Sequence, residues 1–228
     1  MPDSATIYEI ASVTKTFTAS LLSQMVAAGD VALDDPVSLH LPPDVQMPAN
    51  GGDGITLEDL ATHYSGLPTA TPFPECVLFD PENSLAGFGA QEIYDFLAGY
   101  SLTRAPGAAF EYSNLGIGLL GHALAYSQGS TYEALLKERV LDPLGMADTA
   151  ITLTPEQEAR RVPGHGGFVP RPRFVMDQLA PAGGLASTVD DLLTYLEHHM
   201  GLVADGSLNE ALAATHVQRA SNPPIGGG

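Results

Sequence analysis

The residues best suited to chemistry lie near the start of the chain, in the segment Ser12-Val13-Thr14-Lys15. Residues three apart on a helix share a face, so the Ser12 hydroxyl and the Lys15 amine would lie within hydrogen-bond reach. A serine hydroxyl is a weak nucleophile until a base takes its proton, and a desolvated lysine can serve as that base because burial lowers its pKa. The alternative is a solvated surface lysine, although a cation is unfavourable in the first turn of an apolar helix.

A second candidate group is Glu111-Tyr112-Ser113-Asn114, which follows Ala105-Pro106-Gly107. A tyrosine on a tight loop before a helix can present its phenol to a pocket, and a phenol beside a cation can act as a general acid or base. Asn114 could cap the helix that follows and offer its amide outward. Taken alone, Tyr112 could equally be a packed aromatic side chain and Asn114 only a cap.

The remaining reactive side chains indicate no further site. The single cysteine, Cys76, excludes an internal disulfide and a cysteine-built metal site, and no catalytic Cys–His signature surrounds it. His198 and His199 fall near the expected end of a helix, where a cation is favourable without any metal. His165-Gly166-Gly167 is interpreted as part of a loop. The sequence therefore predicts no metal and no cofactor.

Composition narrows the possible partners. The chain has 228 residues, with 27 acidic against 9 basic side chains and a formal net charge of −18. Such a charge repels phosphate backbones and anionic headgroups, so neither nucleic acid nor a membrane surface is expected as a partner. No run of 18 apolar residues is present, and no membrane span is expected. Oligomeric state is left open.

The elements that would position these residues are mostly helices. Apolar periodicity and capping residues predict helices at 12–29, 56–64, 90–98, 114–127, 131–141 and 188–200. Residues 5–10 are the one plausible strand, and a lone strand cannot form a sheet, so most strands of any sheet are expected outside this chain. Residues 68–89 read as a long loop, and residues 163–175 as an irregular hairpin or extended loop. Ser12 is expected to cap its helix, and Gly29 to end it.

Five blocks in a fixed order together resemble the serine β-lactamase and penicillin-recognising hydrolase family, in its class C-like branch. They are YEIASVTKTFTA, LATHYSGLP, PGAAFEYSNLGIGLLG, ERVLDPLGMADT and PAGGLASTVDDL, at 8–19, 60–68, 106–121, 138–149 and 181–192. Ser-x-x-Lys is a signature motif of these enzymes. The branch includes class C β-lactamases, D-alanyl-D-alanine carboxypeptidases and related esterases.

The resemblance implies a serine hydrolase of α+β class, with the β-lactamase/transpeptidase-like fold. Ser12 would be the acylated nucleophile, Lys15 its activating partner, Tyr112 the second proton-transfer group and Asn114 a substrate-binding residue. The substrate would be a small-molecule ester, peptide or β-lactam. A periplasmic or secreted location is implied, but residues 1–11 show no secretory signal, and a cytoplasmic location stays open.

The family pattern is incomplete in this chain. A third box, Lys-Thr-Gly or His-x-Gly on a strand, normally follows the block at 181–192, and none does so here. We therefore expect residues 1–228 to be one incomplete domain, with 5–200 matching the family and 201–228 approaching missing strands. This chain alone is expected to be mostly helical and inactive. The alternative is a non-catalytic family member with a binding role or none.

Overall fold

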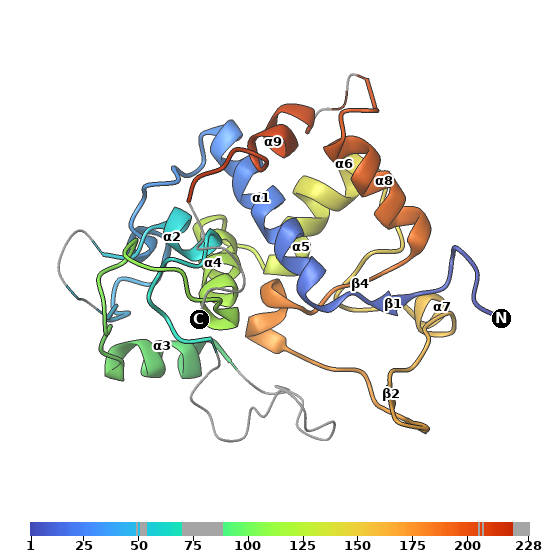
Figure 1. The fold of residues 1–228 in the computed structure, drawn as a ribbon, viewed down its shortest axis with the longest axis horizontal. Coiled ribbons are helices and arrows are strands. Elements are labelled where there is room, and N and C mark those ends of the chain that lie inside the picture. The colour runs from blue at the N-terminus through green and yellow to red at the C-terminus, as the bar shows by residue number, and fades with distance from the viewer. Residues whose placement is uncertain (49, 51–53, 70–88, 205, 207, 221–228) are drawn as a thin grey trace, which may run out of the picture.

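Helix α1 runs through the middle of the protein, and the other elements are arranged around it (Figure 1). The computed structural model describes residues 1–48, 50, 54–69, 89–204, 206 and 208–220. Cys76 and most of the expected loop 68–89 lie outside the described residues. The described elements in chain order are β1 (Tyr8–Glu9), η1 (Ala11–Val13), α1 (Thr14–Ala28), η2 (Val37–His40), α2 (Leu57–Ala61), α3 (Ala90–Gly99), α4 (Asn114–Ser127), α5 (Tyr132–Leu136), η3 (Lys137–Leu141), α6 (Asp142–Leu144), α7 (Pro155–Glu158), β2 (His165–Gly166), β3 (Val169–Pro170), η4 (Asp177–Ala182), β4 (Ala186–Ser187), α8 (Val189–His199) and α9 (Asn209–Ala214).

The sequence of α1 explains its central place. Phe17, Leu21 and Met25 recur every four residues and are completely buried, so one face of the helix lies in the core. Gly29 ends the helix in the left-handed conformation (φ 78°), as predicted. The first turn differs from the prediction. It is a 3-10 turn, η1, and the Ser12 side chain does not cap it.

Helix α4 packs closely against η4, and two glycines permit this approach. A Cβ on Gly118 would lie 2.4 Å from Leu179 Cδ2, and one on Gly121 would lie 2.3 Å from Pro181 Cγ. Both distances are far below a normal carbon–carbon contact of about 3.5–4.0 Å. The helix begins at Asn114, but its cap is Ser113, whose hydroxyl accepts the Gly116 N–H at 2.9 Å. The prediction that Asn114 caps this helix is wrong by one residue.

Two short antiparallel pairs make up the strand structure of the described residues. Strand β1 pairs with β4, with Tyr8 opposite Ser187 and Glu9 opposite Ala186. The expected strand at 5–10 therefore exists in shortened form, and it pairs with the two-residue strand β4, which the sequence signals did not reveal. Strands β2 and β3 form the hairpin predicted at 163–175, and His165 is exposed on it.

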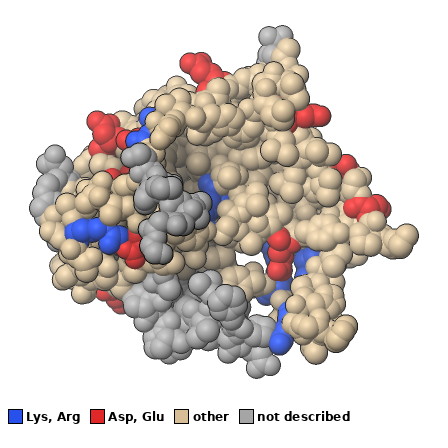
Figure 2. All heavy atoms as spheres, in the orientation of Figure 1, with Lys and Arg blue, Asp and Glu red and all other residues tan. Residues whose placement is uncertain are grey.

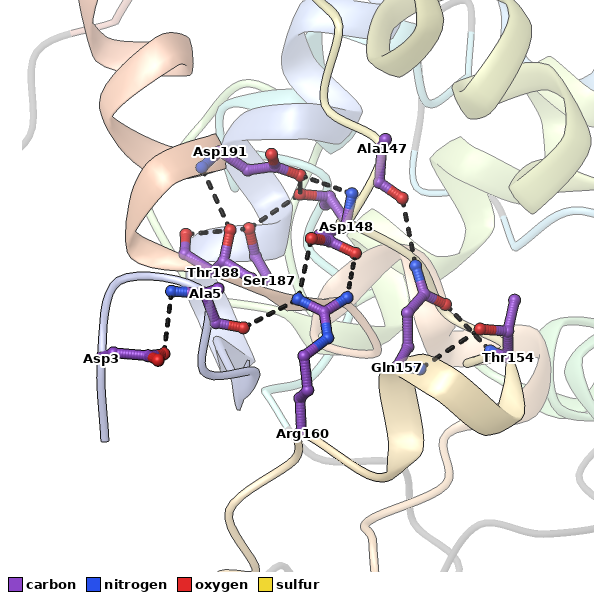
Figure 3. Close-up of polar contacts among 11 residues, drawn as sticks. Asp3, Ala5, Ala147, Asp148, Thr154, Gln157, Arg160, Ser187, Thr188 and Asp191 are labelled. Carbon is purple, nitrogen blue, oxygen red and sulfur yellow. Dashed lines mark hydrogen bonds and ion pairs between the residues drawn. The ribbon is translucent and has the colours of Figure 1, made fainter. Parts of the chain in front are cut away.

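A polar network fixes the segment that leads into β1 (Figure 3). Arg160, just after α7, forms a bidentate ion pair with Asp148 and donates to the Ala5 carbonyl at 2.9 Å. Asp191 on α8 accepts the Asp148 N–H at 2.9 Å and the Thr149 hydroxyl at 2.7 Å. The hydrogen bonds from Arg160 hold the pKa of Asp148 below its usual range, whereas burial raises the pKa of Asp191. The network joins the chain start, α7 and α8.

The other predicted helices are present with altered ends. Thr56 and Asp59 form a reciprocal capping box on α2, as the sequence indicates. The helix expected at 131–141 continues through a π-helical turn, η3, into α6, and it ends at Gly145 in the left-handed conformation (φ 72°). The sequence signals did not reveal α7 or α9. No helix in the described ranges is long and apolar enough to cross a membrane.

Helix α8 exposes much of its apolar stripe. The stripe consists of five apolar residues at helical spacing: Val189, Leu192, Leu193, Leu196 and Met200. Of these, Leu192 packs against the core, and Tyr195, which lies outside the stripe, is buried. The other four are exposed by 45–69%: Val189, Leu193, Leu196 and Met200. Within the described residues, the stripe is therefore not covered.

Candidate active site

Ser12 lies in η1, where strand β1 passes into α1. Ala11, the residue before it, has φ 45°, a left-handed conformation that a non-glycine side chain adopts at a cost. The neighbouring backbone is held from two directions, because Ile10 N–H donates to the Leu185 carbonyl at 3.0 Å and Leu185 N–H donates to the Thr14 hydroxyl at 3.2 Å. Ser12 is thus presented on an exposed turn that rests on the segment before β4.

The Lys15 ammonium lies beside the Ser12 hydroxyl, as the three-residue spacing predicts. Its Nζ is 3.1 Å from Ser12 Oγ and donates to the Ala182 carbonyl at 2.5 Å. Both partners are uncharged, and the side chain is half-buried. Burial is the main effect and lowers the pKa of Lys15, and the neighbouring Tyr112 opposes part of that shift. This environment favours a neutral amine more than water does.

Tyr112 completes the group from a position 100 residues along the chain. Its Oη is 2.8 Å from Ser12 Oγ, and Lys15 Nζ lies 4.8 Å from the centre of its ring. The Ser12 hydroxyl therefore contacts two side chains that can exchange protons with it. The three predicted residues Ser12, Lys15 and Tyr112 come together in one cluster.

Asn114 is close in sequence but is not joined to this cluster by hydrogen bonds between described residues. It is the first residue of α4, is half-buried, and donates its backbone N–H to the Thr69 carbonyl at 3.4 Å. Its side-chain amide forms no hydrogen bond to another described residue.

The site also uses residues that were not singled out from the sequence. Lys15 donates to the Ala182 carbonyl of η4, and the buried Thr18 hydroxyl donates to the neighbouring Pro181 carbonyl at 2.7 Å. Two side chains of α1 therefore hold η4. His63, within the block LATHYSGLP, lies against the ring of Tyr112 with ring centres 4.6 Å apart. Only the presence of His63 in a quoted block could have drawn attention to it.

The surface over α1 is hollowed and largely uncharged. Figure 2 shows acidic side chains mainly toward the edges of this face, with a single basic side chain recessed in the central hollow. A separate cavity of about 550 Å³ adjoins His63 between α1, α2 and α9, and Glu58 and Arg219 form an ion pair across 3.8 Å on its wall.

Known proteins with similar sequences carry hydrolase names. The D-alanyl-D-alanine-carboxypeptidase/endopeptidase AmpH of Escherichia coli (strain K12) is 33% identical over 87% of this chain and 50% of its own length. A β-lactamase of Pseudomonas fluorescens is 34% identical over 92% of this chain and 56% of its own length. The chain thus spans about half the length of these relatives.

Solved structures agree with the sequence matches. A β-lactamase/D-alanine carboxypeptidase from Yersinia pestis superimposes with a TM-score of 0.78 at 28% identity, covering 92% of this chain and 59% of the other. A class C β-lactamase gives a TM-score of 0.80 at 28% identity, covering 94% and 56%. The α+β class and the β-lactamase/transpeptidase-like fold are confirmed. A family model described as Beta-lactamase matches residues 2–228, and the chain therefore belongs to the β-lactamase family of hydrolases.

Proposed function

We propose that this protein is a serine hydrolase that forms an acyl-enzyme on Ser12. The observation that carries the proposal is the pair of hydrogen bonds at Ser12 Oγ, 3.1 Å from Lys15 Nζ and 2.8 Å from Tyr112 Oη. A nucleophile and its base are expected at about 2.6–3.2 Å, so this geometry is ready for proton transfer.

Acylation follows from these contacts. Ser12 Oγ forms a bond with the substrate carbonyl carbon while its proton passes to the neutral Lys15 amine, directly or through Tyr112. The carbonyl electron pair moves onto oxygen, where the Ser12 N–H can stabilise it. When this tetrahedral intermediate collapses, the bond to the leaving group breaks, and the leaving group takes the proton from the Lys15–Tyr112 pair.

Deacylation repeats the same steps with water. Water attacks the acyl carbon and gives a proton to Lys15, and the tetrahedral intermediate expels Ser12, which regains that proton. The lowered pKa of Lys15 matters in both stages, because only the unprotonated amine can accept a proton.

The substrate is proposed to be a small-molecule ester, peptide or β-lactam. Two relatives are named for D-alanyl-D-alanine carboxypeptidase and β-lactamase activities, which share an acyl-transfer step. Asn114 is proposed to bind the substrate through its side-chain amide. Ester or peptide hydrolysis is favoured over efficient β-lactam hydrolysis, because many members of this branch are unspecialised. A periplasmic or secreted location is proposed by the same resemblance, and cell fractionation would test it.

The test is intact-mass spectrometry of the protein expressed from its complete reading frame, after incubation with a fluorophosphonate or with penicillin. One adduct per chain is expected, absent in Ser12→Ala and retained in Ser38→Ala, which removes an exposed serine elsewhere. An adduct that persists in Ser12→Ala would refute the assignment. An absence of any adduct would favour the non-catalytic alternative.

Turnover then separates the substrate classes. Rates would be compared for p-nitrophenyl acetate, a peptide ending in D-alanyl-D-alanine and nitrocefin. The proposal expects the ester or the peptide to be released catalytically. Nitrocefin turnover that exceeds both would instead assign a β-lactamase.

A further inference from the structure

We propose that His63 is the positioning residue that holds Tyr112 against Ser12. The inference deepens the proposed function and rests on it, because Tyr112 must exchange protons with Ser12 for its position to matter. His63 lies in the turn after α2, so it belongs to a part of the fold separate from α1, which follows Ser12, and α4, which follows Tyr112.

The two neighbours of Tyr112 are both bound to this one histidine. Glu111 N–H donates to the His63 carbonyl at 2.8 Å, and Ser113 N–H donates to His63 Nδ1 at 3.1 Å. The imidazole Nδ1 thus accepts a backbone N–H in the way that a backbone carbonyl does in a β-sheet. Because residues 111 and 113 are both fixed, the backbone of Tyr112 has little freedom to turn.

The imidazole ring also supports the tyrosine side chain. It lies 4.6 Å from the Tyr112 ring, tilted by 37°, and meets Phe110 edge-on at 5.8 Å. His63 therefore contacts both Phe110 and Tyr112, the two aromatic side chains on either side of Glu111. Such contacts limit the swing of the phenol whose Oη lies 2.8 Å from Ser12 Oγ.

The arrangement needs a neutral imidazole, since Nδ1 must keep a lone pair to accept the Ser113 N–H. Burial, with a smaller contribution from the Lys15 charge, lowers the pKa of His63 to about 4, so the ring is neutral near pH 7. The ionisable groups around it are Lys15 on α1, Tyr112 on the loop, and Glu58, Glu210 and Arg219 on the adjoining cavity.

The backbone of His63 guides the choice of variants. Its φ of 65° is left-handed, a conformation in which histidine and asparagine are enriched among residues other than glycine. His63→Asn accepts this backbone and can keep an acceptor near the position of Nδ1, but it removes the ring. His63→Phe keeps a ring and removes the acceptor. His40→Phe is the matched control, because His40 is also half-buried and hydrogen-bonded, to Asp35 at 2.9 Å.

The first measurement is independent of activity. In the wild-type protein, nitrogen NMR should find His63 Nδ1 unprotonated and its proton on Nε2, with a titration well below pH 6.5. Hydrogen exchange at the Ser113 amide should be at least about 10-fold faster in His63→Phe and close to wild type in His63→Asn. A proton on Nδ1, or unchanged exchange in His63→Phe, would overturn the proposal.

The second measurement is the rate of Ser12 acylation by the fluorophosphonate. Misplacement of Tyr112 in His63→Phe is expected to slow acylation by about 10- to 100-fold, with His40→Phe near wild type and His63→Asn recovering most of the rate. An equal loss of acylation rate in His63→Asn and His63→Phe would overturn the proposed role of His63 Nδ1 as the acceptor for the Ser113 N–H. If the wild-type protein is never acylated, the proposed function fails, and Ser113 exchange and the His63 tautomer still decide the positioning role.

Discussion

Replacing Gly121 by alanine tests whether the close packing of α4 on η4 supports the site. The new Cβ would lie 2.3 Å from Pro181 Cγ, 2.4 Å from Pro181 Cβ and 3.0 Å from Tyr132 Cδ2. A proline ring cannot rotate away, so η4 must move by more than 1 Å, roughly the shortfall from a normal contact of about 3.5–4.0 Å.

The size of the effect follows from two opposing contributions. Overpacking costs about 1–3 kcal/mol, and the rigid neighbour places this site near the upper value. Alanine regains about 1 kcal/mol over glycine inside a helix. The expected net loss is about 2 kcal/mol in the free energy of unfolding, and a fall of about 4–8 °C in Tm for a chain of this size.

The matched control is Gly99→Ala at the end of α3, where a Cβ meets nothing within 4 Å. This change is expected to stabilise the protein by about 0.5 kcal/mol, because it restricts only the unfolded chain. Urea denaturation gives both values, and acylation of Ser12 should slow only in Gly121→Ala, since η4 carries the Ala182 carbonyl that holds Lys15. If Gly121→Ala were as stable as Gly99→Ala, the inferred packing would be wrong.

Three further outcomes are expected. Lys15→Arg should slow acylation by at least about 100-fold, because arginine keeps the charge but cannot release its proton. The wild-type acylation rate should rise as pH rises through the lowered pKa of Lys15. Near-normal labelling of Lys15→Arg, measured by mass spectrometry, would contradict the role of Lys15 as the base. His63 binds fewer protons when folded than when unfolded between about pH 4 and 6.5, so wild-type stability should fall as pH falls through that window, with a smaller fall in His63→Asn by urea denaturation. Arg160→Met should free the Ala5 carbonyl and speed hydrogen exchange at the amides next to β1, and unchanged exchange would show that the Asp148–Arg160 pair does not anchor this segment.

Local signals in the sequence predicted much of the helical structure. A cap or a capping box acts within one helical turn, so Thr56 with Asp59 could be recognised from the sequence, as could the end of α1 at Gly29. The Ser12–Lys15 contact belongs to the same class, because the backbone alone brings residues three apart together. The Tyr112 prediction depended on the family resemblance as well as on the loop before α4.

Local signals also explain the errors. Ser113 and Asn114 are both good caps, and the backbone conformation selected the serine. The pairing of β1 with β4 joins residues nearly 180 positions apart, which no short-range pattern encodes. Helix α8 has a clear apolar stripe, yet which side faces the core depends on its neighbours, and in the described residues four of its apolar side chains remain exposed.

The sequence by itself determined most of the longer helices, the Thr56–Asp59 capping box, the end of α1 at Gly29 and the Ser12–Lys15 contact, because each depends on interactions within one or two helical turns. Only the tertiary structure brought Tyr112 to Ser12 across 100 residues, the Ala182 carbonyl to Lys15 across 167, and His63 to Ser113 across 50. The close packing of α4 on η4 at Gly118 and Gly121 likewise depends on the fit of distant surfaces. This fit depends on how the side chains of distant segments fill the interior, and helical periodicity in the sequence does not specify it.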